Sequence, residues 1–107
     1  MNDVQFIEAA RKFAERVLRE AGASDEDRLN FAFRSIVGRR PGDEEMKKLL
    51  AFQAEYRQMF GEDPESATQL LSAGESPRDE SLDVSDVAAW SMVAHLLMNL
   101  SETITKG

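Results

Sequence analysis

Apolar residues recur at three- and four-residue steps along most of the chain, and no segment shows the strict apolar–polar alternation of a half-buried strand. Such spacing places apolar side chains on one face of an α-helix. It predicts five helices, over residues 3–21, 25–37, 44–60, 64–73 and 84–105. We therefore expect an all-α fold, a compact five-helix bundle that forms a single domain over residues 1–107.

The ends of these helices carry residues that commonly start and stop a helix. Glycine just past a helix takes the left-handed conformation at little cost. The candidate stops are Gly22, Gly38, Gly61, Gly74 and the terminal Gly107. At the helix starts, a side-chain oxygen can accept hydrogen bonds from the free backbone N–H groups of the first turn. The candidate caps are Asn2 or Asp3, Ser24 with Asp27, Asp43, Asp63 before Pro64, and Asp83 with Asp86.

The last predicted helix is apolar on almost every side from Val87 to Leu100. A helix of this kind is normally surrounded by the rest of its domain, so we expect a central, mostly buried last helix. The alternative is a helix with one face on the domain and another on a partner, which includes a weak homodimer through this helix. Trp90 and His95 lie on different sides of it and are candidate residues for such a contact.

Helical spacing also places several other side chains. The apolar face of the third helix predicts a buried set of Leu49, Phe52, Tyr56, Met59 and Phe60. On the charged face of the first helix, four-residue spacing predicts surface ion pairs between Glu8 and Lys12 and between Glu15 and Arg19. The sequence Asn99-Leu100-Ser101 matches the acceptor pattern for N-glycosylation. Because it falls inside the apolar last helix, we expect Asn99 to bond a loop backbone from within the core.

The charge of the chain is strongly asymmetric. Residues 1–53 carry ten acids and ten bases, whereas residues 54–107 carry ten acids and three bases, so the net charge of −7 comes from the second half. This excess argues against nucleic acid and anionic membranes as partners, since both require a basic surface. No stretch is apolar enough for a membrane span, and the first residues do not resemble a signal peptide. The expectation is a soluble chain that does not insert into a membrane.

Few residues carry recognisable chemistry. The chain has no cysteine and one histidine, so a thiolate site or a histidine metal cluster cannot form, and His95 is expected to be a partly buried structural residue. Asp79, Ser81 and Asp83 start like a calcium loop, but Val84 and Trp90 stand where glycine and glutamate are needed. Arg39 and Arg40 follow the second helix, where they can bond its last carbonyls or bind an anion. We predict no enzyme, no cofactor and no metal.

Five segments stand in a characteristic order and spacing. They are Asn2 to Arg11, Ala32-Phe33-Arg34 through Gly38-Arg39-Arg40-Pro41, Gly74 to Arg78, Ala88-Ala89-Trp90, and Leu97 to Glu102. Together they resemble a known bacterial family, the carboxy-terminal end of the planctomycete-type, cytochrome-c-associated domain of unknown function numbered 1553. The resemblance covers nearly the whole chain and departs from the family's pattern at Val4 and Ser101.

The resemblance implies a domain excised from the C-terminus of a larger, exported bacterial protein. It carries no established activity. It favours a non-catalytic accessory or interaction domain that packs on other domains of its parent. The alternative is part of an enzyme active site, in which Arg39, Arg40 and Arg78 would line a cleft completed by those other domains.

Overall fold

The computed structural model describes the backbone of residues 3–74 and 77–106 and the side-chain surroundings of residues 5–74 and 77–101. This part of the chain forms five α-helices and no strand. They are α1 (Asp3–Glu20), α2 (Asp25–Val37), α3 (Asp43–Glu62), α4 (Pro64–Leu71) and α5 (Val84–Lys106). The predicted all-α fold and the five helices are confirmed, and no helix end differs from its prediction by more than two residues.

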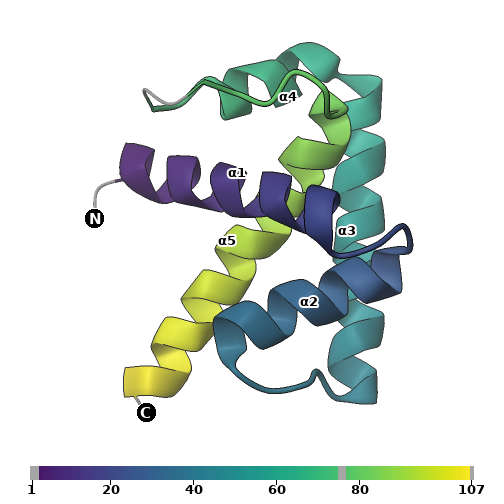
Figure 1. Ribbon diagram of the computed structural model, residues 1–107, viewed down its shortest axis with the longest axis vertical. Coiled ribbons are helices and arrows are strands. Elements are labelled where there is room, and N and C mark those ends of the chain that lie inside the picture. Colours follow the sequence, from purple (N-terminus) through teal and green to yellow (C-terminus); the bar gives the residue numbers. More distant parts are fainter. Residues whose placement is uncertain (1–2, 75–76, 107) are drawn as a thin grey trace.

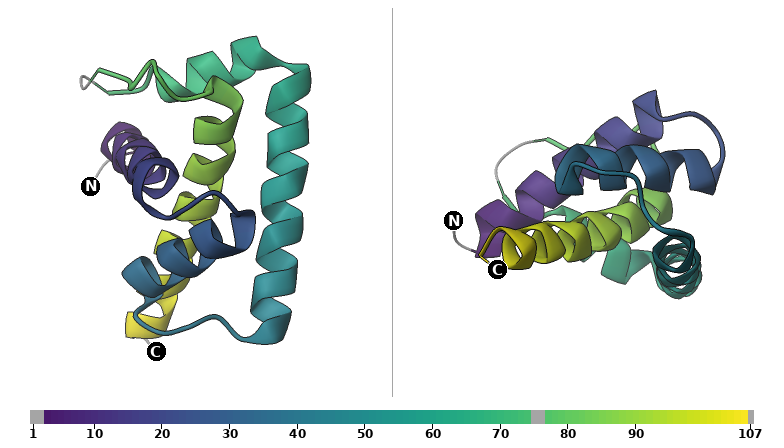
Figure 2. Two further views of the ribbon diagram at one scale, coloured as in Figure 1. Left: turned by 45° about the vertical axis from the view of Figure 1, so that its right-hand side comes forward. Right: turned by 90° about the horizontal axis from the view of Figure 1, so that it is seen from below.

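Helix α5 is the centre of the arrangement and contacts each of the other four helices. In Figure 1, α1 crosses in front of α5, α2 lies below α1, α3 runs along the right-hand side and α4 lies at the top. Seen from below in Figure 2, α1 and α2 lie on one side of α5 and α3 lies at its flank. No other helix of the described chain covers the opposite side of the second half of α5 in that view.

The core forms where the first half of α5 meets the other helices. From Ser85 to Ala94, every residue of α5 is buried except Asp86 and Met92. Trp90 is the largest fully buried side chain. The other helices contribute Ala14, Val17, Leu29, Ala32, Phe33, Leu49, Phe60, Ala67 and Leu71 to the same cluster. The prediction of a central helix is therefore confirmed for this half.

The second half of α5 is less enclosed than the first, within the predicted arrangement of a central, mostly buried last helix. Beyond Ala94, Leu97 is the one buried residue in the described part of this helix, and Leu96 is 36% exposed. Asn99 is exposed and does not face the core as we expected. Instead the Ser101 hydroxyl donates a hydrogen bond to the Ile36 carbonyl, at 3.2 Å, near the end of α2. This half of α5 thus packs on one side only.

Helix α3 buries only part of the predicted apolar face, on which Tyr56 also packs against the core. Leu49 and Phe60 are buried, but Phe52 is 42% and Met59 49% exposed. The polar side chain of Gln53 takes an inner position instead, with the residue 4% exposed. Positions 49, 53 and 60 share one side of a helix with 3.6 residues per turn. Helix α3 has more apolar residues than its contact with the core can bury. Their spacing along the sequence alone did not show which of them are buried.

The helix starts follow the predicted caps at three of the described positions. Ser24 Oγ accepts from the Asp27 N–H at 3.0 Å, Asp63 Oδ1 from the Ser66 N–H at 3.2 Å, and Asp83 Oδ2 from the Asp86 N–H at 3.1 Å. The prediction for Asp43 is wrong, because Gly42 precedes the helix and Asp43 is its first residue. The predicted cap at Asn2 and the stop at Gly107 lie outside the described residues.

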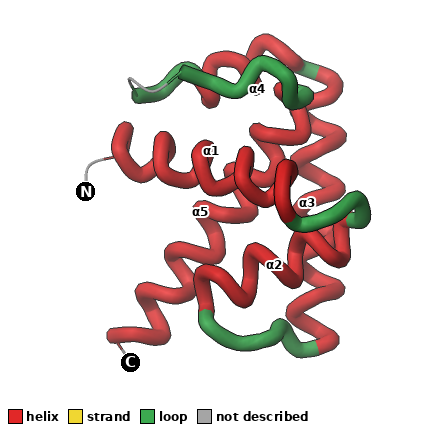
Figure 3. The backbone as a smooth tube through the Cα atoms, in the orientation of Figure 1, coloured by secondary structure: helices red, strands yellow, loops and turns green. Residues whose placement is uncertain are grey.

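Three of the predicted glycine stops have the left-handed backbone, with φ of 96° at Gly22, 88° at Gly38 and 90° at Gly74. Gly61 does not stop a helix, since it lies within α3. That helix continues to Glu62 and ends at Asp63, which also caps α4. One residue thus serves two helix ends, and the chain turns sharply there (Figure 3).

Candidate functional site

One side of α5 carries Met92, Leu96 and Asn99, which we call the α5 face. These residues are spaced four and three apart and so lie in one row along the helix. Leu96 and Asn99 are exposed and Met92 is half-buried. The α5 face thus exposes Leu96 beside the polar Asn99, on the helix that organises the core.

His95 borders the α5 face and connects α5 to α1. Its ring packs edge-on against Phe6, with the ring centroids 4.7 Å apart and the ring planes at 76°. Together with Ile7, Ala10, Leu70, Ser91 and Met92 it lines a cavity of about 20 Å³. A cavity of this size holds at most about one water molecule. The surroundings of His95 are therefore those of a packing residue, as its place in an apolar helix suggested.

Trp90 lies on the other side of α5 and is 1% exposed. Its indole N–H has no hydrogen-bond acceptor among the described residues. A buried indole N–H usually has a partner, and leaving it without one costs about 1–3 kcal/mol. Because the ring is enclosed by the core cluster, Trp90 is not part of the surface, contrary to its candidacy as a contact residue.

Arg39 is held between the two helices that its loop connects, α2 and α3. Its guanidinium makes two hydrogen bonds of 2.8 Å to the Glu45 carboxylate and lies over the Phe33 ring, 5.0 Å from its centroid. The same carboxylate accepts from the Gly42 N–H at 2.8 Å. The Arg39 bonds, with a smaller contribution from the Gly42 N–H, lower the pKa of Glu45 from 4.5 to about 2. The Glu45 bonds in turn raise the pKa of Arg39. Arg39 thus fixes the start of α3.

Arg40 and Arg78 do not join Arg39 in a common cluster. Arg40 is exposed beside Arg39 in the connection between α2 and α3, whereas Arg78 is half-buried in the connection between α4 and α5. These two connections lie at opposite ends of the molecule, at the bottom and the top of Figure 1. The structure therefore does not bring Arg39, Arg40 and Arg78 to one cleft of this domain.

A buried ion pair ties the connection before α5 to α1. We call residues 77–83 the strap. Arg11 is 1% exposed, and its Nη1 donates to the Pro77 carbonyl at 3.1 Å and to Glu15 Oε2 at 3.4 Å. Glu15 Oε2 also accepts from the Asp79 N–H at 2.8 Å. The predicted surface pair of Glu15 with Arg19 is therefore wrong, because Glu15 faces the strap and pairs with Arg11.

Asp79 provides the outer attachment of the strap. Its carboxylate accepts from the hydroxyl and the N–H of Ser81 at 2.6 and 3.0 Å, and pairs with Arg19 at 2.8 Å. The hydrogen bonds from Ser81, and to a smaller extent the pairing with Arg19, lower the pKa of Asp79.

Among the described residues, no group of three or more histidines, cysteines and acids is arranged to hold a metal ion. The predicted Glu8–Lys12 pair is present, at 3.8 Å.

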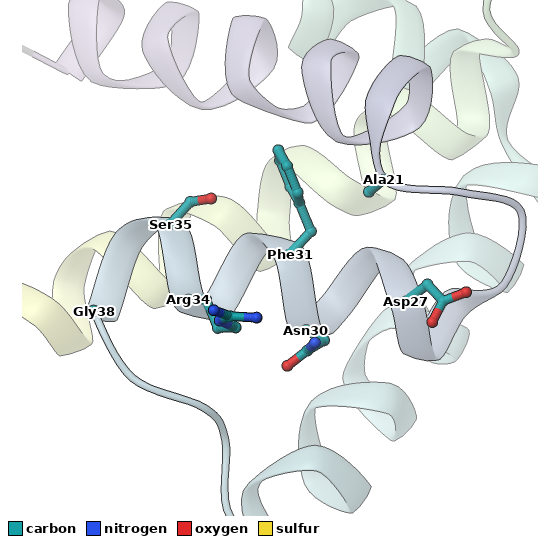
Figure 4. A pocket seen from close by; sticks show the side chains of 7 residues that line it. All are labelled: Ala21, Asp27, Asn30, Phe31, Arg34, Ser35 and Gly38. Atoms are coloured by element: carbon teal, nitrogen blue, oxygen red, sulfur yellow. The ribbon is translucent and has the colours of Figure 1, made fainter.

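A hollow that the sequence pattern did not predict lies along α2. It has a volume of about 530 Å³ and is lined by Ala21, Asp27, Asn30, Phe31, Arg34, Ser35 and Gly38. In Figure 4 the Phe31 ring points toward α1, whereas Asn30 and Arg34 extend from another side of α2. The Arg16 guanidinium lies over this ring, 5.3 Å from its centroid. Its polar lining consists of one acidic, one basic and two neutral side chains. Among the described residues, no contact joins two of these side chains into a nucleophile and a general base.

No family model, curated protein or solved structure matches this chain. The resemblance to the domain of unknown function numbered 1553 therefore stays a prediction. In the described part of the chain, none of the helices has the length and apolar character that a membrane crossing needs.

Proposed function

We propose that this chain is a helical interaction domain that packs on other domains of a larger, exported protein through the α5 face. The supporting observation is the uneven cover of α5. The same helix is fully enclosed at Trp90 and Val93 but leaves Leu96 36% exposed two residues after buried Ala94. Apolar surface of this kind is stabilised when a partner removes it from water, by about 25 cal/mol per Å².

The surroundings of the α5 face are better suited to binding another protein than to binding a small molecule. The cavity beside it, at His95 and Met92, is about 20 Å³, far below the size of a ligand site, which is about 300 Å³ or more.

The proposal is tested in the protein encoded by the full reading frame. With the remaining domains expressed as a separate chain, the present domain is expected to bind them, and Leu96→Glu is expected to abolish binding. Met59→Glu is the matched control, because Met59 is at least as exposed, at 49%, but lies on α3. A reading frame that encodes no further domain, or equal binding by the two variants, would contradict the proposal.

A further inference from the structure

The outer side of α3 presents a second apolar surface, independent of the α5 face. Phe52 is 42% exposed there and lines a shallow hollow of about 200 Å³ with Lys48, Ala51 and Glu55. We call these four residues the α3 patch. Phe52 stacks on Tyr56, with ring centroids 6.2 Å apart, and Tyr56 stacks on buried Phe60 at 6.4 Å. The exposed ring is therefore held in place from the core side.

The charges of the α3 patch are arranged symmetrically about its apolar centre. Lys48 and Glu55 are seven residues apart, which is about 10 Å along the helix axis, and lie on the same side. Along the helix axis, Lys48 and Glu55 lie equally far from the midpoint between Ala51 and Phe52, one on either side of it. Neither has an ion pair or a hydrogen bond to the part of the chain that the structure describes.

This arrangement is complementary to itself. A twofold axis through the midpoint of Ala51 and Phe52 places a second α3 antiparallel to the first. Lys48 of each copy then faces Glu55 of the other, and the Phe52 ring of each enters the hollow beside the other's Ala51. The small Ala51 side chain lets the two helices approach. Contacts that repeat on both sides of an axis are the mark of a closed twofold dimer.

We propose that the α3 patch is the interface of a weak antiparallel homodimer, with a second copy of this chain as its occupant. An interface of one helix face is smaller than the roughly 1,200 Å² of stable complexes, so the dimer forms at high protein concentration only. This dimer uses α3 and leaves the α5 face free. It therefore does not depend on the proposed docking of the domain to its parent.

Sedimentation equilibrium up to the millimolar range tests the dimer through charge swaps. Lys48→Glu places like charges opposite each other at both ends of the interface and is expected to raise the dissociation constant about tenfold. Glu55→Lys is expected to do the same. The double swap Lys48→Glu with Glu55→Lys restores opposite charges and is expected to return the constant to near its original value.

Two controls separate this geometry from a general effect of charge. Lys47→Glu makes the same change of charge at an exposed residue outside the patch and is expected to leave dimerisation nearly unchanged. Because the chain has no cysteine, single-cysteine variants report proximity directly. Ala51→Cys, next to the axis, is expected to form a disulfide-linked dimer on oxidation, whereas Gln58→Cys is not. Circular dichroism confirms that each variant is folded.

The proposal is overturned if the chain stays monomeric over the whole concentration range. It is also overturned if Lys47→Glu weakens association as much as Lys48→Glu does, or if the double swap associates no better than the single variants.

Discussion

The Glu15 carboxylate accepts a hydrogen bond of 2.8 Å from the backbone N–H of Asp79, which lies 64 residues further along the chain. The same oxygen pairs with Arg11, whose guanidinium also bonds the Pro77 carbonyl. One buried acid thus neutralises a buried cation and satisfies a strap N–H. Because Arg11 is 1% exposed, its charge depends on these partners, and α1 and the strap are expected to unfold together.

Glu15→Ala is expected to lower the free energy of unfolding by about 3–5 kcal/mol, because it breaks a buried ion pair by removing a carboxylate that pairs with Arg11. Glu20→Ala is the matched control in the same helix. Glu20 pairs with Arg16 at 3.2 Å, but about half of each side chain is exposed, and the expected loss is below about 1 kcal/mol. Urea unfolding compares the two. Equal losses would show that the strap does not depend on Glu15.

Gly74→Ala is expected to destabilise the protein more than Gly38→Ala. Both glycines have positive φ, so both substitutions strain the backbone, by about 1–2 kcal/mol. A Cβ at Gly38 meets no atom within 4 Å, whereas one at Gly74 would overlap the Glu8 side chain. The difference between the two variants measures this overlap.

Glu8→Ala combined with Gly74→Ala provides the check on that cause. If the close approach is responsible, the double variant recovers part of the stability that Gly74→Ala loses. A double variant that is less stable by the sum of the two single losses would show that backbone strain alone is at work.

Phe60→Ala and Phe52→Ala form a matched pair on α3. Phe60 is 4% exposed, and its loss leaves a core cavity that costs about 3–5 kcal/mol. Phe52 is 42% exposed, so its loss is expected to cost about 1 kcal/mol or less. Thermal or urea unfolding at low protein concentration, where no dimer forms, distinguishes them. Similar losses at both positions would place Phe52 in the core, as the sequence pattern alone predicted.

The ion pair of Arg39 and Glu45 predicts a defined acid dependence. Since folding lowers the pKa of Glu45 to about 2, its contribution to stability is present above about pH 4.5 and is lost as the pH falls toward 2. The difference in unfolding free energy between the original protein and Glu45→Gln is therefore expected to be largest at neutral pH and to shrink through this window. A difference independent of pH would contradict the pair. The size of the effect is reduced by solvent, because both side chains are partly exposed.

The helices were predictable because their signals are local. Ser24, the Asp63-Pro64 pair and Gly38 each act within one turn of their own helix, and the structure confirms all three. The anchor of α3 had a local signal as well. Gly42 and Glu45 stand three residues apart, the spacing at which a glutamate bonds back to the residue before a helix.

The remaining features depend on contacts between distant segments. Glu15 has a possible partner four residues away on either side, and only the position of the strap decides between Arg11 and Arg19. Likewise, Phe52 and Leu49 both fit an apolar stripe on α3, and the placement of α5 decides which of them is buried. Trp90 and Leu96 belong to one apolar run, and only the placement of the other helices around α5 makes the first buried and the second exposed.

The central claim is that α5 organises the domain with its first half and binds other domains with its second. Hydrogen–deuterium exchange of α5 tests it most directly, in this chain alone and in the protein encoded by the full reading frame. The claim predicts that Val87 to Val93 are equally protected in both, while Leu96 to Leu100 exchange readily in the isolated chain and gain protection in the larger protein. Unchanged exchange at Leu96 to Leu100 would contradict it.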